Sequence, residues 1–225
     1  MKFTNILAAS AATILGFAGA SSAAVIDFGV EKGWSSTGHS YGAATVTGAK
    51  VDSFGKIVSN DEYVASWWGA GLGICSASYT SKCTYDTNEN YGRDQHTIDG
   101  QNGGEMALID FGSQDVEITS VTFDYWDYND DFDFGIYASK AVGSAPSPFT
   151  FDAGRGNNGN PKTFTFASGA LVGSLFGIGA WGDNDEFKLS SLTYETQTSP
   201  VPLPATALLL VAGLGGLGVA RRRRK

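Results

Sequence analysis

Between Val25 and Glu195, apolar side chains recur at every second position in many short segments, without a sustained period of 3.6 residues. Alternation of this kind places successive side chains on opposite faces of an extended chain, so it predicts half-buried β-strands. Residues typical of turns separate the segments at intervals of about ten residues. The stretch therefore predicts an all-β domain, for which we expect an antiparallel, jelly-roll-like β-sandwich.

The strands are clearest in the second half of this stretch. The segment Val116–Tyr125 predicts a core face made by its bulkier set of side chains, which are Thr119, Val121, Phe123 and Tyr125. Residues 39–102 are irregular and are expected to form long surface loops. The expected strands span residues 25–28, 45–47, 63–67, 106–111, 116–125, 132–137, 163–166, 171–180 and 187–194.

The N-terminus has the order of a secretory signal. Lys2 supplies a positive charge, residues 6–20 are apolar or small, and Ser21-Ser22-Ala23-Ala24 offers a small-x-small cleavage site after Ala23 or Ala24. The apolar run is too short for a stable membrane span, so we predict a signal peptide at residues 1–24, removed by signal peptidase. An N-terminal helix that stays uncleaved is the alternative.

The C-terminus carries an uncharged run followed by a cluster of bases. Residues 205–220 contain only Ala, Leu, Val, Gly and one Thr. As a helix they would span roughly 24 Å, against a bilayer core of about 30 Å, so we predict one short transmembrane helix. Basic clusters stay on the cytoplasmic side, which puts the preceding domain outside the cell. The cluster comprises Arg221, Arg222, Arg223, Arg224 and Lys225.

Prolines separate the domain from the predicted helix. Because Pro200, Pro202 and Pro204 cannot lie inside a helix, residues 196–204 are expected to form an extended linker. The predicted divisions are a signal peptide (1–24), an ectodomain (25–195), a linker (196–204), a transmembrane helix (205–220) and a cytoplasmic basic tail (221–225).

The linker leads into the pentapeptide Val201, Pro202, Leu203, Pro204 and Ala205, followed directly by the apolar run and the basic cluster. This order resembles the PEP-CTERM class of C-terminal sorting signals, in the variant whose motif reads Val-Pro-Leu-Pro-Ala (VPLPA). The resemblance implies recognition by a membrane-embedded exosortase, cleavage near the motif, and transfer to the cell surface or to exopolysaccharide. The Pro-Glu-Pro triplet is absent, so the resemblance does not locate the cleaved bond. An ordinary membrane anchor is the alternative.

Residues 103–195 also resemble the ectodomains that accompany such signals. The matching segments are Glu105–Phe111, Val116–Val121, Asp130–Phe134 and Asp185–Leu192. These motifs are mostly structural, so this resemblance implies no catalytic activity.

The predicted ectodomain is strongly acidic. Lys2 and the five C-terminal bases lie outside it, which leaves nine bases against 23 acids and a net charge of −14. Such a charge repels nucleic acid and anionic lipid, so both are excluded as partners. The same charge attracts divalent cations, although an acidic exterior is also common in exported proteins.

The two cysteines, Cys75 and Cys83, are close in sequence. An even number of cysteines in an exported chain favours a disulfide. The loop that it closes is short, so we expect a stabilisation of only ~2–3 kcal/mol.

The densest acidic stretch suggests a cation site. Asp127, Asp130, Asp131 and Asp133 offer carboxylate oxygens, which Ca²⁺ prefers, and a second acidic turn at residues 183–186 adds more. The spacing does not match an EF-hand. The alternative is a pair of solvated turns, in which Asn and Asp are favoured for backbone reasons. Calcium is the only cofactor that the sequence suggests.

Several aromatic side chains are candidates for a ligand platform, above all Trp67, Trp68 and Trp126. Exposed rings can stack on sugars, so exopolysaccharide is a candidate ligand. Because alternation sends about half of such side chains inward, a core position is the alternative for each.

Catalytic motifs are scarce. The two histidines, His39 and His96, lack a metal-ligand spacing, and there is neither a Gly-x-Ser-x-Gly motif nor a phosphate-binding loop before a helix. We therefore expect a non-enzymatic protein at the cell surface or in the extracellular matrix, acting as an interaction module. The alternative is a surface-tethered polysaccharide hydrolase, which would use paired carboxylates.

Overall fold

The computed structural model describes residues 22–30, 33–35, 38–67, 69–75, 97–100, 103–156, 158–182 and 185–197. These residues belong to one compact unit, Ser22–Gln197, which within the described ranges contains strands and turns but no helix. The strands are β1 (Ala23–Asp27), β2 (Gly33–Ser35), β3 (His39–Tyr41), β4 (Ala44–Val51), β5 (Ile57–Trp67), β6 (Gly71–Cys75), β7 (Ile98–Asp99), β8 (Gly104–Asp110), β9 (Val116–Asp124), β10 (Phe132–Ile136), β11 (Phe149–Ala153), β12 (Lys162–Thr165), β13 (Val172–Gly173), β14 (Leu175–Ala180) and β15 (Glu186–Thr196).

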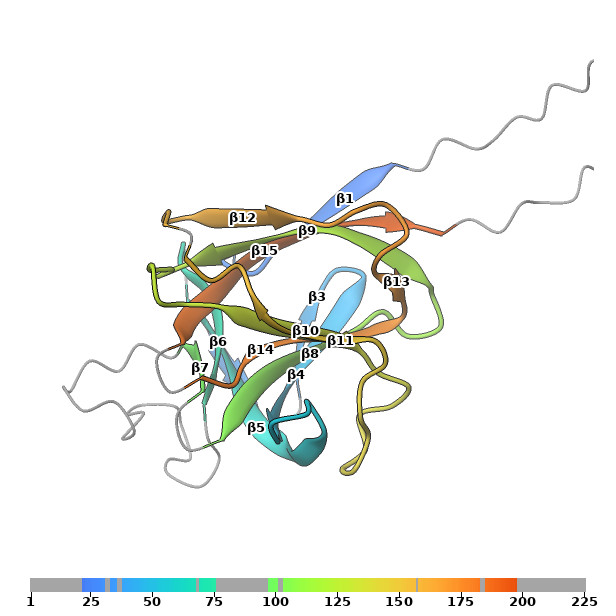
Figure 1. Ribbon diagram of the computed structural model, residues 1–225. Helices are drawn as coiled ribbons and strands as arrows, with labels where there is room; N and C mark the ends of the chain where they lie inside the picture. The colour runs from blue at the N-terminus through green and yellow to red at the C-terminus, as the bar shows by residue number, and fades with distance from the viewer. Residues whose placement is uncertain are drawn as a thin grey trace, which may run out of the picture. The chain divides into compact units, whose positions relative to one another are not determined.

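The strands form one antiparallel sheet that curves into a half-barrel. Its order is β11-β10-β14-β8-β4-β5-β6-β15-β9-β12, and Figure 1 shows β12, β9 and β15 in a layer that faces β10, β14 and β8. The long strand β5 connects the layers, because its first half pairs with β4 and its second half with β6. The all-β, antiparallel prediction is confirmed. The jelly-roll sandwich is not confirmed, since β5 makes the two layers parts of one continuous sheet.

The sequence pattern located most of the longer strands but divided one region wrongly. The expected strand at residues 171–180 is two strands, β13 and β14, separated by Ser174. The pattern missed five strands, β2, β3, β6, β7 and β11, of which four lie within the predicted irregular region or before it. These strands have two to five residues, too few for alternation to be recognised.

A β-bulge changes the buried face in the middle of β9. Thr193 of β15 pairs with Ser120, and Tyr194 pairs with Ile118, so Thr119 is an extra residue between two ladder pairs. Side chains therefore point inward at Val116 and Ile118 before the bulge, and at Val121 and Phe123 after it. The predicted core face is correct for Val121 and Phe123. It is wrong for Thr119, which is only half-buried, because the extra residue reverses the alternation on its N-terminal side. It is also wrong for Tyr125, which is exposed and lies beyond the end of β9 with a φ of 61°.

Aromatic side chains fill the space between the layers. The ring of Phe123 lies 4.7 Å from that of Phe187 and 4.8 Å from that of Phe132, and Trp126 lies 5.0 Å from Phe164. Pairs at these separations stabilise a core beyond their buried area. The cluster joins β9, β10, β12 and β15, so it holds the open side of the sheet together.

Glycine lets β14 pack closely against its neighbours. A Cβ atom at Gly179 would collide with the backbone carbonyl of Glu105, and one at Gly177 would collide with the side chains of Met106 and Tyr137. The glycines in the apolar segment at 175–180 therefore mark close contact rather than a turn.

The first and last strands are neighbours. Ala23 pairs with Glu195 and Asp27 with Ser191, so the start of β1 lies beside the end of β15, as Figure 1 shows. Beyond β15, the backbone N–H of Gln197 donates to the carbonyl of Asp115, and its side-chain amide donates to Glu117 at 3.1 Å. Both ends of the folded unit therefore lie at one corner of the sheet.

Some of the sequence predictions concern residues that the structure does not describe. Residues 1–21 of the predicted signal peptide, the predicted transmembrane helix and the basic tail lie outside the described residues. Among the residues that the structure describes, none form a helix of the length and apolar character needed to cross a bilayer. Cys75 is buried at the end of β6, but Cys83 lies outside the described residues, so the disulfide stays a prediction.

Replacing Phe123 by Ala should destabilise the domain by about 3–5 kcal/mol, because the cavity would lie where four aromatic rings meet. The free energy of unfolding, measured by urea denaturation, checks this value. Tyr125→Ala is the matched control two residues away: its ring is 49 % exposed, so the loss should stay below about 1 kcal/mol. Equal losses for the two variants would contradict the described core.

Candidate functional site

The fold brings the two acidic turns of the sequence together. The turn before β10 carries Asp130 and Asp131, and Asp185 and Glu186 lie where β15 begins. The N–H of Asp131 donates to Asp185 Oδ1 at 3.0 Å, and the N–H of Glu186 donates to Asp130 Oδ1 at 3.1 Å. This reciprocal pair of hydrogen bonds joins segments more than fifty residues apart.

Backbone donors occupy much of the capacity of two of these carboxylates. Asp130 also accepts from the N–H of Asp127 at 2.5 Å, and Asp185 accepts from the N–H of Gly182 at 2.9 Å. The exposed Asp127 accepts from the N–H of Asn129, which is the geometry of an Asx turn. Of the four predicted calcium ligands, Asp127 and Asp130 therefore accept hydrogen bonds from backbone N–H groups.

The other two predicted ligands, Asp131 and Asp133, converge with a third residue that the sequence did not single out. Asp131, Asp133 and Asp152 each offer a carboxylate oxygen, and these three oxygens lie within 4.8 Å of one another. We call these three residues the carboxylate triad. Asp131 and Asp133 are buried, whereas Asp152 is exposed.

A second β-bulge brings Asp152 to the triad. The register between β10 and β11 shifts between Phe132 and Phe134, so β11 carries an extra residue there. Asp152 adopts a φ of 51°, and its N–H donates to Asp133 Oδ1 at 3.1 Å. A bulge redirects a side chain in this way, and nothing in the local sequence around residue 152 indicates the long-range pairing that produces it.

Burial raises the pKa values of the carboxyl groups at this site. Desolvation, opposed by the N–H of Asp152 and reinforced by the charges of Asp131, Asp152 and Asp185, raises the pKa of Asp133 to about 7. Desolvation and the charges of Asp185 and Asp152 raise the pKa of Asp131 to about 6. Burial likewise raises the pKa values of Asp130 and Asp185 to about 6.

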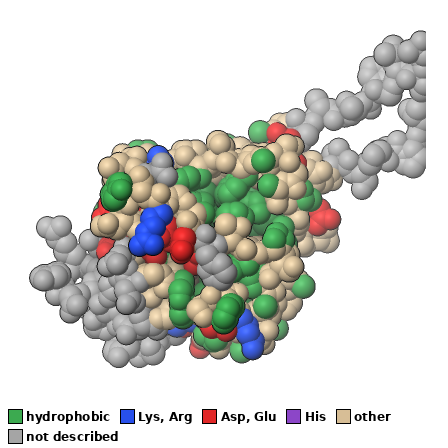
Figure 2. Space-filling model, viewed as in Figure 1, with side chains coloured by type: hydrophobic (Ala, Val, Ile, Leu, Met, Phe, Trp, Pro, Cys, Tyr) green, Lys and Arg blue, Asp and Glu red, His purple; other side chains and the backbone are tan. Residues whose placement is uncertain are grey.

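The base Arg155 lies beside the triad. Arg155 Nε lies 3.7 Å from Asp131 Oδ2, and its side chain is 66 % exposed. Its charge lowers the pKa values of Asp131 and Asp185, but it offsets only part of the negative charge. Figure 2 shows basic and acidic side chains side by side on one face of the domain, with apolar side chains around them.

The triad has the donor set of a hard cation site. Ca²⁺ takes six to eight oxygen ligands, and the triad offers one oxygen from each of three carboxylates. Asp152 is exposed, so the site lies at the surface of the domain. The residues that could hold a cation are therefore Asp131, Asp133 and Asp152, with Asp185 next to them.

The predicted aromatic platform is corrected at one position. Trp126 is only 3 % exposed and packs in the aromatic core, so it cannot present a face to a ligand. Its neighbours in sequence, Tyr125 and Tyr128, are 49 % and 59 % exposed. Nothing is described of the Trp67 side chain or of Trp68.

Tyr125 lies near Asn160 and Tyr128 lies near Gly156, the residue after Arg155. The backbone of Tyr125 has a φ of 61°, which is unusual for a bulky residue, and its N–H donates to Asn160 Oδ1 at 3.0 Å. The ammonium of Lys188 lies 5.0 Å from the centre of the Tyr125 ring. The Tyr128 hydroxyl lies close to Gly156. Two exposed rings therefore lie close to the segment that follows Arg155.

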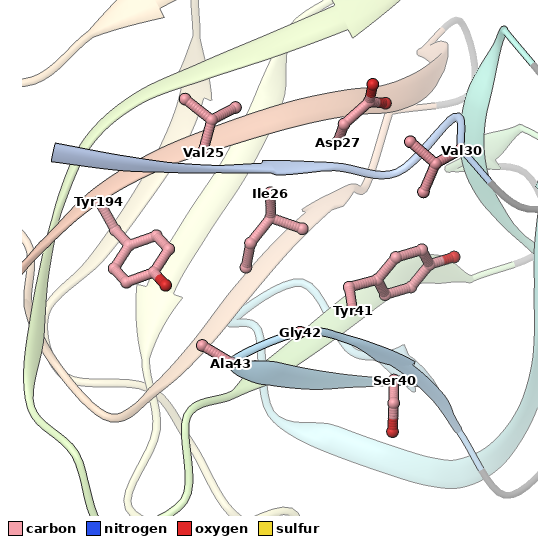
Figure 3. A pocket seen from close by; sticks show the side chains of 9 residues that line it. All are labelled: Val25, Ile26, Asp27, Val30, Ser40, Tyr41, Gly42, Ala43 and Tyr194. Carbon is pink, nitrogen blue, oxygen red and sulfur yellow. The ribbon is translucent and has the colours of Figure 1, made fainter.

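A separate groove of about 400 Å³ lies between β1 and the turn that joins β3 to β4. Figure 3 shows Ile26, Tyr41 and Tyr194 in the space between these elements. Both tyrosines are nearly buried, and the one carboxylate of the lining, Asp27, accepts from the N–H of Gly29 at 2.8 Å. The groove is therefore largely apolar and lacks a pair of acidic groups.

Fold and site together define an acidic all-β domain with a buried carboxylate cluster. The comparison with protein families adds the C-terminal segment: the model of the PEP-CTERM protein-sorting motif matches residues 200–225. This motif supports an exported, cell-surface-directed protein that an exosortase processes. The curated proteins and the solved structures gave no match.

In the absence of divalent cations, the domain should lose stability as the pH rises from about 4 to about 7. The ordinary pKa of 3.8 is raised to about 7 at Asp133, so the folded protein holds more protons than the unfolded chain in this window. Asp133→Asn keeps an acceptor for the N–H of Asp152 but cannot ionise. It should therefore raise the melting temperature at pH 8 in chelator and flatten the pH profile.

Asp110→Asn is the control of opposite sign. Burial alone would raise the pKa of Asp110, but the hydrogen bond and charge of Lys140 hold it below its usual value. The ionised carboxylate therefore stabilises the fold, and this variant should lower stability at pH 8.

Calcium should raise the melting temperature of the parent protein and leave that of Asp133→Asn unchanged. A parent melting temperature that is the same with calcium and with chelator would count against a cation site.

Proposed function

We propose that this is an exported protein of the cell surface or extracellular matrix, sorted by an exosortase through a VPLPA-type signal. Its ectodomain acts as a non-catalytic interaction module, with exopolysaccharide as the candidate ligand and calcium as the candidate cofactor. The single observation that carries the proposal is the match of the PEP-CTERM sorting motif to residues 200–225.

The end of the folded unit supports this assignment. Its last described residue, Gln197, is hydrogen-bonded to Asp115 and Glu117, and the matched motif begins three residues later. The pentapeptide Val201–Ala205 follows within the match. The boundary of the folded unit therefore lies just before the motif, as expected for a sorting signal that is separate from the domain.

The surface beside the carboxylate triad is the candidate ligand site. Tyr125 and Tyr128 offer ring faces for stacking on sugars, and the exposed Arg155 offers hydrogen-bond donors to a ligand. A cation on Asp131, Asp133 and Asp152 would neutralise part of the local negative charge. It would also let an anionic polysaccharide approach a domain with a net charge of −14.

The alternative, a polysaccharide hydrolase, needs two carboxylates on either side of a bound sugar. The groove beside β1 has only Asp27 among its lining residues, and this carboxylate accepts a local backbone N–H. In the triad, one oxygen of each acid lies within 4.8 Å of the other two, an arrangement that suits a single cation bound between them. Both observations favour an interaction module.

Removal of the exosortase should leave the protein uncut and bound to the membrane, because the tail is the processing signal. Cell fractionation and intact mass, in cells with and without the enzyme, check this result. Pro202→Ala with Pro204→Ala should have the same effect in normal cells, whereas Pro200→Ala, outside the pentapeptide, should be processed. A tail that stays intact in normal cells would contradict the sorting proposal.

Replacing both Tyr125 and Tyr128 by Ala should weaken retention of the ectodomain on the producing cell's exopolysaccharide by about tenfold or more, which is ~1.4 kcal/mol. Affinity electrophoresis in gels that contain the polysaccharide measures the change. Phe54→Ala, which removes a ring that is 73 % exposed elsewhere on the domain, should bind like the parent. Unchanged retention of the double variant would remove these rings from the ligand site.

A further inference from the structure

The beginning of the folded unit bears on where the leader is removed. All five residues of β1 pair with β15, from Ala23 opposite Glu195 to Asp27 opposite Ser191. Ile26 is buried opposite the fully buried Leu192, and Ala24 packs against the same core. The backbone ladder continues at Phe28, whose N–H donates to the carbonyl of Ser190 at 2.9 Å. β1 is therefore a paired strand of the domain and not a loose arm.

Cleavage at the positions first expected from the sequence would cut into this strand. A cut after Ala23 removes one ladder residue, and a cut after Ala24 removes two of the five. The second cut would also remove Ala24, which is partly buried and packs against the core. Either cut would shorten the strand that pairs with β15.

The sequence contains another small-x-small site before the strand. Ala18-Gly19-Ala20 has alanine at both required positions and follows the apolar run directly. A cut after Ala20 precedes the first ladder residue by two residues, so β1 would be retained whole. The α-ammonium created by this cut would lie on Ser21, directly before the exposed Ser22.

We infer that signal peptidase cleaves after Ala20, so that the mature protein begins at Ser21 and keeps the whole of β1. This inference rests on the proposed export of the protein. It assigns the cleaved bond from the register of the β1–β15 ladder, because Ala20 and Ala23 both satisfy the sequence rule.

Intact mass and N-terminal sequencing of the exported protein test the inference. The expected N-terminus is Ser21. An N-terminus at Ala24 or Val25 would overturn the inference and leave the proposed export standing. A chain that still begins at Met1 and stays inside the cell would contradict both, so the two failures are distinguishable.

Two substitutions test directly which alanine precedes the cleaved bond. Ala20→Phe places a bulky residue at the cleaved position, so the precursor should accumulate or be cut elsewhere. Ala23→Phe is the matched control: Ala23 is exposed, and this variant should still begin at Ser21. The reverse pattern, with Ala23→Phe blocked and Ala20→Phe processed at its usual rate, would overturn the inference.

Discussion

The backbone ladder of β15 is the interaction on which the rest of the domain depends. One edge of this strand pairs with β9 over most of its length, and the other edge pairs in turn with β7, β6 and β1. Through β6 and β5 the same strand connects to the facing layer. Its side chains Phe187, Leu189 and Leu192 are fully buried, so hydrogen bonds and apolar packing act along the same strand.

The candidate site depends on that ladder as well. Asp185 and Glu186 lie where β15 begins, and their hydrogen bonds with Asp130 and Asp131 hold the acidic turns against each other. Carboxylates so placed repel one another, and burial adds to the cost of their charge. Backbone N–H groups satisfy Asp130 and Asp185, which leaves Asp131, Asp133 and Asp152 as the part of the cluster suited to a cation.

Alternation in the sequence was enough to predict an all-β domain and most of its longer strands, because burial on one face imposes a period of two. It could not predict the bulges at Thr119 and near Asp152, since each depends on a partner strand distant in the sequence. Two predictions at the site were incomplete for this reason: the exposure of the aromatic residues after β9, and the set of acidic residues that meet. Tyr125 is exposed and Trp126 is buried because the chain leaves β9 with a positive φ, and Asp152 reaches the triad through a bulge. The C-terminal sorting motif could be predicted without the fold, because it is defined by a continuous stretch of sequence.

The pairing of β1 with β15 also bears on how the chain is exported. The first strand of the domain gains its partner only when the last strand has been synthesised and has crossed the membrane. Contacts of such large sequence separation form slowly, since loop closure must come first. The domain therefore cannot complete its sheet until its last strand is available to the first. Folding then brings both ends of the domain to the corner from which the sorting segment continues.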